Sequence, residues 1–194
     1  MSNIILKTRT RILEAAVILL ENSGGSGVRM TDIAKQAGIT RQALYLHFKT
    51  RAQLLIATTV YVDEQKGMTQ RLAASRAAQT GLERLDAYIE AWVGYIPEIY
   101  GIGKALLAMR ETDEAAAKAW DERMQDMREG CEAAIMALDR DKMLLPDLDP
   151  DQATDFLWTM LSVRNWEQLT IDCGWPQEQY VATLKSMARR SFVI

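Results

Sequence analysis

The 194-residue chain is 48% hydrophobic, which is enough for one or two compact domains with their own core. Its two cysteines, Cys131 and Cys173, lie far apart and lack metal-ligand spacing, so neither a disulfide framework nor a metal site is expected. The sequence shows no secretory segment, and no apolar run approaches the roughly 18 residues of a membrane span. We therefore expect a cytoplasmic protein without membrane contact.

The charge is unevenly distributed along the chain. The formal net charge of −3 by itself argues against a nucleic-acid-binding protein. Residues 1–51, however, hold eight Lys/Arg against three Asp/Glu, a net charge of +5. Residues 52–194 hold fifteen against twenty-three, a net charge of −8. A basic head on an acidic body is the asymmetry expected when only one end of a molecule approaches DNA.

The first predicted helix begins at residue 8 or 10 and ends at residue 22. Its apolar residues recur at helical spacing, and the glycine-rich stretch 24–27 terminates it. The basic residues at its start are either phosphate contacts or part of an ordinary solvated face. They are Lys7, Arg9 and Arg11.

Residues 30–55 predict a helix-turn-helix followed by the start of a further helix. Gly38 falls where the chain must reverse, a position that often needs the positive φ that glycine adopts without strain. The hydroxyl of Thr40 can cap the second helix, and Leu44 and Phe48 lie on its buried side. Together with the first helix, these two helices form a three-helix head.

The other residues of the second helix are predicted to face DNA. Arg41 and Gln42 offer the donor and acceptor geometry that guanine and adenine present in the major groove. The polar and basic groups further along would contact phosphates. The predicted DNA-binding residues are Thr40, Arg41, Gln42, Ala43, Tyr45, His47, Lys49 and Arg51.

This stretch resembles the N-terminal domain of the tetracycline-repressor (TetR) family of transcriptional regulators. The resemblance is carried by Thr-x-x-Ile-Ala-x-x-Ala-Gly-Ile-Thr-x-x-x-Leu-Tyr-x-His-Phe-x-x-Arg-x-x-Leu-Leu, of which Leu-Tyr-x-His-Phe is the most specific part. It implies that Tyr45, His47 and Arg51 contact phosphate. Gln42 stands where many members have glycine, and Arg51 replaces lysine. The operator sequence therefore cannot be taken from a relative.

A long connector helix is predicted from residue 51 to the low seventies, with Gly67 loosening or ending it. Beyond it, Pro97 and two glycines are expected to break the chain between two helices. The helices predicted for this part cover residues 81–96, 104–109, 113–138, 151–171 and 176–191. No segment has strand periodicity.

The predicted fold class is therefore all-α, with about nine helices. We expect a helix-turn-helix DNA-binding domain over residues 1–52. Residues 53–194 would form a helical-bundle body, which the TetR resemblance assigns to effector binding and dimerisation.

The last two predicted helices carry apolar residues on more than one face, as expected for helices with two partners. One partner is the core of the body, and the other is a second subunit, unless both faces belong to the core. The TetR resemblance favours a homodimer whose two heads read a palindrome. The predicted interface residues are Leu157, Leu161, Tyr180 and Leu184.

Aromatic and methionine side chains of the body are candidates for an effector site, because they adapt to or stack on flat apolar molecules. Such stripes are more often core, so the expected pocket rests on the TetR resemblance. Arg164 would either pair with an acidic ligand or form a salt bridge. The candidate residues are Trp92, Met124, Met127, Met160 and Arg164.

The favoured function is a homodimeric repressor that binds a palindromic operator in double-stranded DNA and is released by a small apolar or aromatic effector. The alternative is a helical architectural or interaction protein that binds DNA without small-molecule control. An enzyme is not expected, because the single histidine, His47, lies in the head and no phosphate-binding glycine loop is present. No cofactor is expected either.

Overall fold

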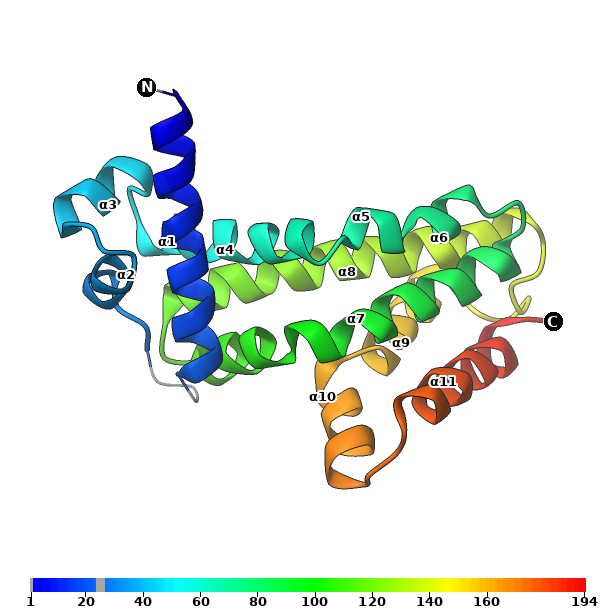
Figure 1. Cartoon of the computed structure of the whole chain (residues 1–194). Coiled ribbons are helices and arrows are strands. Elements are labelled where there is room, and N and C mark those ends of the chain that lie inside the picture. The colour runs from blue at the N-terminus through cyan, green and yellow to red at the C-terminus, as the bar shows by residue number, and fades with distance from the viewer. Residues whose placement is uncertain (1, 24–26) are drawn as a thin grey trace. The chain divides into compact units, whose positions relative to one another are not determined.

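The computed structural model describes residues 2–23 and 27–194, and within these ranges the side chains from residue 5 onward. These residues form eleven α-helices and one π-helical segment (Figure 1). The all-α fold class is thus confirmed. The helices are α1 (Ser2–Asn22), α2 (Met30–Gln36), α3 (Arg41–His47), α4 (Arg51–Gln65), α5 (Met68–Arg71), α6 (Ala73–Ala77), α7 (Gly81–Met109), α8 (Glu114–Arg140), α9 (Pro150–Met160), α10 (Val163–Trp166), η1 (Glu167–Asp172) and α11 (Gln177–Phe192).

The number of helices also agrees with the prediction once short turns are set aside. Helix α10 continues directly into the π-helical segment η1. If these two are counted as one helix, the described ranges contain nine helices of seven or more residues. An antiparallel bridge joins Leu144 to Val193. None of the helices in residues 2–23 and 27–194 is both long and apolar enough to cross a membrane.

The chain divides into two compact units. The N-terminal unit comprises Met1–Lys66 and Ile99–Arg123, and the C-terminal unit comprises Gly67–Glu98 and Met124–Ile194. Helices α7 and α8 contribute residues to both. The expected boundary between residues 52 and 53 stays a prediction.

The core of the N-terminal unit holds the head together. Helix α1 packs against α2 and α4, and α2 packs against α3, as Figure 1 shows. Each helix contributes a side chain with no exposed surface to one apolar cluster, and segments of α7 and α8 join the same cluster. The fully buried side chains include Ile12, Ile33, Leu44 and Leu54, and the cluster also contains Leu106 of α7 and Ala119 of α8.

Helix α7 runs unbroken from Gly81 to Met109 with Pro97 inside it, so the predicted break between two helices is wrong. Proline has no N–H to give to the carbonyl four residues earlier, here that of Val93. The side-chain amide of Gln177 donates to this carbonyl at 2.9 Å. A contact from α11 thus replaces the hydrogen bond that proline removes.

The predicted helix over residues 151–171 is also wrong, because it is divided after α9. Ser162 caps α10, and its hydroxyl accepts from the N–H of Asn165 at 3.2 Å. The Leu161 carbonyl consequently lacks that N–H, and the indole N–H of Trp92 donates to it at 3.0 Å. Both helix interruptions in the C-terminal unit are therefore satisfied by side chains from other helices.

Two further boundaries differ from the prediction. Helix α1 starts at Ser2, several residues earlier than expected. Helix α4 ends at Gln65, short of the low seventies, because Gly67 adopts a φ of 68° that stops a right-handed helix. Helix α1 ends at Asn22 as predicted, whereas residues 24–26 of the glycine-rich stretch expected to terminate it lie outside the described residues.

Candidate nucleic-acid interface

The turn between α2 and α3 has the conformation that the sequence predicts. Gly38 has a φ of 65°, where glycine is favoured. The guanidinium of Arg11 donates to the carbonyl of Ala37 at the end of α2 and lies 3.4 Å from that of Gly38. Arg11 therefore stabilises the turn by bonding to its backbone.

Helix α3 is fixed at its start and along its inner face. The Thr40 hydroxyl accepts from the N–H of Ala43 at 3.1 Å, which confirms the predicted cap. Leu44 is fully buried and Phe48 is 3% exposed. The inner face of α3 therefore anchors the helix while its other face points outward.

The outward face carries the residues predicted to contact DNA. Thr40, Arg41, Gln42 and Lys49 are exposed, and Ala43, Tyr45 and His47 are half-buried. The Arg41 guanidinium lies over the Tyr45 ring at 5.5 Å. A rigid helix thus presents two side chains able to bond base edges, beside an aromatic and a basic group.

Leu46 also lies on this outward face, as the helical spacing predicts, although it is not among the residues predicted to bind DNA. Its side chain is 75% exposed on the reading helix. An apolar side chain in the major groove can contact the methyl group of thymine. The signal was available in the sequence, since the spacing that buries Leu44 and Phe48 turns Leu46 outward.

Arg51 has a different environment from the other predicted contacts. Its Nε donates to the Val28 carbonyl at 2.6 Å, and its Nη1 lies 2.5 Å from both carboxylate oxygens of Asp113. Only 21% of each of the two paired side chains is exposed. The guanidinium predicted to meet phosphate is thus bonded to the protein.

The pKa of Asp113 reflects this pairing. Burial raises the pKa of the carboxyl, but the hydrogen bond and charge of Arg51, with the N–H groups of Ala116 and Ala115, lower it by more. The net shift is downward. Asp113 is therefore charged at neutral pH and matches the guanidinium of Arg51.

The structure places the residues predicted for the dimer interface in the core, which corrects that prediction. Leu157, Leu161 and Tyr180 have no exposed surface, and Leu184 is 5% exposed. Side chains buried within one chain cannot form a contact with a second subunit. The faces that remain exposed on the same helices include Phe156 on α9 and Met187 on α11.

The residues predicted for an effector site lie in several environments of the C-terminal unit. Trp92, Met127 and Met160 are buried, Met124 is half-buried and Arg164 is exposed. Trp92 packs edge-on against Tyr95, with ring centroids 6.1 Å apart.

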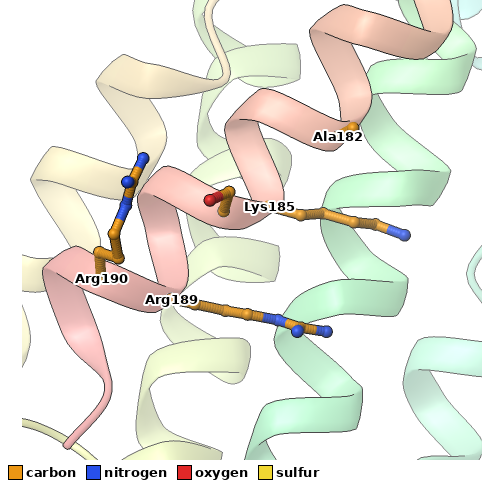
Figure 2. A pocket seen from close by; sticks show the side chains of 5 residues that line it. Ala182, Lys185, Arg189 and Arg190 are labelled. Atoms are coloured by element: carbon orange, nitrogen blue, oxygen red, sulfur yellow. The ribbon is translucent and has the colours of Figure 1, made fainter.

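A shallow depression lies instead along α11. It is lined by Ala182, Lys185, Ser186, Arg189 and Arg190, and Figure 2 shows Lys185 and Arg189 extending to one side of the helix and Arg190 to the other. Lys185 pairs with Glu90 and Arg189 with Asp86 of α7. This charged surface contains none of the predicted effector residues.

The described part of the chain gathers no group of three or more His, Cys, Asp or Glu side chains that could hold a metal ion. The two cysteines are separate and unpaired in a disulfide, Cys131 being buried and Cys173 exposed.

Comparison with known proteins identifies the family of the helix-turn-helix domain. The model of bacterial regulatory proteins of the tetR family matches residues 12–58, which span the second half of α1, the helix-turn-helix and the first half of α4. Residues 12–58 therefore form a DNA-binding domain of the TetR family. Members of this family are DNA-binding transcriptional regulators and not enzymes, as predicted.

Relatives extend this TetR match beyond the head. The HTH-type transcriptional regulator CymR of Pseudomonas putida is 26% identical over 172 residues, which cover 81% of this chain and 75% of CymR. NalD, the secondary repressor of the MexAB-OprM multidrug efflux pump in Pseudomonas aeruginosa, has a crystal structure with a TM-score of 0.68 and 25% identity, covering 96% and 97% of the two chains.

A third similar structure shows the same fold at lower identity. It is that of a transcriptional regulator of Saccharomonospora viridis in complex with choline, with a TM-score of 0.74 and 17% identity. It covers 97% of this chain and 98% of its own. The likeness to this TetR-type fold thus includes the C-terminal unit.

Proposed function

We propose that this TetR-family regulator is a homodimeric repressor that binds a palindromic operator and leaves it when a small apolar or aromatic effector binds the C-terminal unit. The proposed operator binding rests on the exposed pair Arg41 and Gln42 on the capped first turn of α3. An N-terminal turn of this kind is the part of a reading helix that meets base edges. Tyr45, His47 and Lys49 would then set the register against phosphates.

A homodimer is the form in which one short reading helix gains affinity and a palindrome is read by symmetry. Apolar side chains left exposed on the last helices support this assembly. Phe156 is 53% exposed on α9, although its ring packs edge-on against Phe192, and Met187 is 44% exposed on α11. These two replace the buried residues first predicted for the interface.

The assembly is tested by sedimentation of the wild type and of the Phe156→Ser/Met187→Ser double variant. Dimer dissociation should increase in the double variant. Ile18→Ser, which removes a 45% exposed side chain on α1, is the matched control and should leave the dimer intact. A wild-type monomer at micromolar concentration, or equal behaviour of both variants, would refute this interface.

Effector control is supported by the aromatic and methionine content of the C-terminal unit and by relatives. The Saccharomonospora viridis regulator was crystallised with choline, and NalD is a repressor of an efflux pump. An effector needs only to bind the DNA-free conformation better than the operator-bound one. Allosteric coupling is typically about 1 to 3 kcal/mol, equivalent to a change of roughly 5-fold to 150-fold in affinity.

The test is a screen of small apolar and aromatic compounds for a rise in Tm, followed by operator binding at saturating concentration of each hit. The proposal expects at least one hit to weaken operator binding by the factor above. Hits that bind without changing operator affinity would favour the alternative, a DNA-binding protein without small-molecule control.

A further inference from the structure

Arg51 joins three segments of the N-terminal unit. It is the first residue of α4, its Nε bonds to the carbonyl of Val28 just before α2, and its Nη1 bonds to Asp113 between α7 and α8. Val28 is itself 5% exposed, although its neighbours Gly27 and Arg29 are exposed. One guanidinium thus links the entry of the helix-turn-helix to the turn that precedes α8.

Asp113 is also held in place by backbone N–H groups of α8. Its Oδ1 accepts from the N–H groups of Ala115 and Ala116 at 3.1 and 3.2 Å, which fixes the carboxylate at the start of α8. The carboxylate cannot follow Arg51 outward without giving up these bonds. Arg51 in turn would have to leave both Asp113 and Val28 to give the same nitrogens to a phosphate.

A charged, mostly buried pair is costly to break, because each partner is then left unsatisfied. If Arg51 turned to a phosphate at the protein surface, it would lose its hydrogen bond to the Val28 carbonyl and its link to the segment that holds Asp113. The environment of Arg51 therefore favours an internal contact that is kept when DNA binds.

We propose that Arg51 is a positioning residue for DNA recognition and not a phosphate contact, and that Asp113 acts through it to set the orientation of the helix-turn-helix. The turn between α7 and α8 is then part of the DNA-reading machinery, although it lies about 60 residues further along the chain. The inference rests on the DNA binding of the family and needs neither an effector nor a dimer.

The salt dependence of DNA binding distinguishes a positioning role of Arg51 from a direct phosphate contact. A true phosphate contact contributes about one unit to the slope of log K against log salt concentration. Binding of the wild type, Arg51→Gln, Asp113→Asn and the double variant is measured between 50 and 200 mM salt. The probes are a labelled duplex selected by the wild type from a random library and a labelled random-sequence duplex.

Two control variants calibrate the slope and the charge change. Lys49→Gln removes an exposed cation predicted to meet phosphate, and it should lower the slope by about one unit. Asp121→Asn breaks an exposed pair with Arg110 in the same unit and should leave selected-duplex binding unchanged. Arg51→Lys should bind the selected duplex as weakly as Arg51→Gln, because an ammonium group cannot bond to Val28 and Asp113 in the geometry of a guanidinium.

The proposal expects Arg51→Gln and Asp113→Asn each to weaken selected-duplex binding roughly tenfold with an unchanged slope, and the double variant to be no weaker than either. Faster amide exchange over residues 28–33 in both variants would report the loosened segment in protein that is still folded. The proposal is overturned if Arg51→Gln lowers the slope by about one unit, or if Asp113→Asn leaves binding unchanged or strengthens it.

The random-sequence duplex distinguishes this failure from a failure of the proposed repressor. If selection yields no motif, the operator proposal fails, but the slope on random DNA still decides whether Arg51 meets phosphate. If a motif is found and Arg51→Gln changes the slope, only the positioning role fails.

Discussion

The side-chain amide of Gln177 donates a hydrogen bond to the carbonyl oxygen of Val93 at 2.9 Å, and this carbonyl is the one that Pro97 leaves without a helical partner. The Oε1 of Gln177 accepts from the indole N–H of Trp166 at 2.8 Å. One glutamine therefore satisfies the interrupted backbone of α7 and a buried indole of α10.

Replacing Gln177 with alanine is predicted to destabilise the protein. Two part-buried polar groups, the Val93 carbonyl and the Trp166 N–H, would lose this partner at a cost of about 1 to 3 kcal/mol. Urea unfolding measures the change. Gln179→Ala, at an exposed position of the same helix, is the matched control and should be nearly neutral.

The double variant Pro97→Ala/Gln177→Ala tests the explanation itself. Alanine at position 97 restores an N–H for the Val93 carbonyl, so the loss of Gln177 should cost less in that background. If Gln177→Ala is as mild as its control, or equally costly with and without Pro97, the contact does not replace the missing helical bond.

Two helical glycines are predicted to respond to alanine in opposite directions. A Cβ at Gly130 would lie 2.3 to 2.5 Å from the Tyr88 phenol, which is buried and donates to the Met127 carbonyl at 2.7 Å. Overpacking of this kind costs about 1 to 3 kcal/mol. A Cβ at Gly94 meets nothing within 4 Å, so Gly94→Ala should gain about 0.5 to 1 kcal/mol.

Chemical denaturation of the two glycine variants checks this prediction with one protocol. Because both changes add the same methyl group to a helix, propensity alone would make both stabilising. A stabilising Gly130→Ala would show that Tyr88 moves aside freely, contrary to its buried hydrogen bond.

The two thiols are predicted to differ in reactivity. Burial raises the pKa of Cys131 to about 12, so at pH 8 this thiol stays protonated as well as inaccessible, whereas Cys173 is exposed. A disulfide reagent at pH 8 should titrate one thiol rapidly in the native protein and both in guanidinium chloride. Cys173→Ser should abolish the fast reaction, and two fast equivalents in the wild type would contradict the buried position of Cys131.

Substitution of both Arg41 and Gln42 by alanine is predicted to relax sequence preference more than affinity for random DNA. Each good bidentate base contact is worth about 1 to 3 kcal/mol of discrimination. The ratio of affinities for selected and random duplexes measures the effect. An equal loss on both duplexes would mean that the pair contributes charge without reading bases.

The head could be predicted from sequence because its determinants are local. Gly38, Thr40 and Leu44 lie within seven residues, and each acts through its own backbone conformation, cap or helix face. The apolar spacing that buries Leu44 and Phe48 needs no knowledge of distant segments. The position of Arg51 could not be predicted in this way, since Asp113 is 62 residues away.

The body was predicted less accurately because distant contacts decide its helix boundaries. A proline signals a break, but Gln177 supplies the bond that lets α7 continue through it. The region around Leu161 and Ser162 has a helical apolar pattern, yet the capping hydroxyl and the Trp92 indole stabilise an interruption there. Apolar patterning likewise cannot distinguish a side chain facing the core from one facing a second subunit.

The most direct test of the proposed function is selection of bound fragments from a random duplex library at moderate salt. The selected motif is then examined for two-fold symmetry. A symmetric motif with half-sites about one or more helical turns apart is the result expected of a sequence-specific dimer reading DNA through α3. Enrichment of DNA without any motif would contradict that account, and it would leave binding by charge and shape alone.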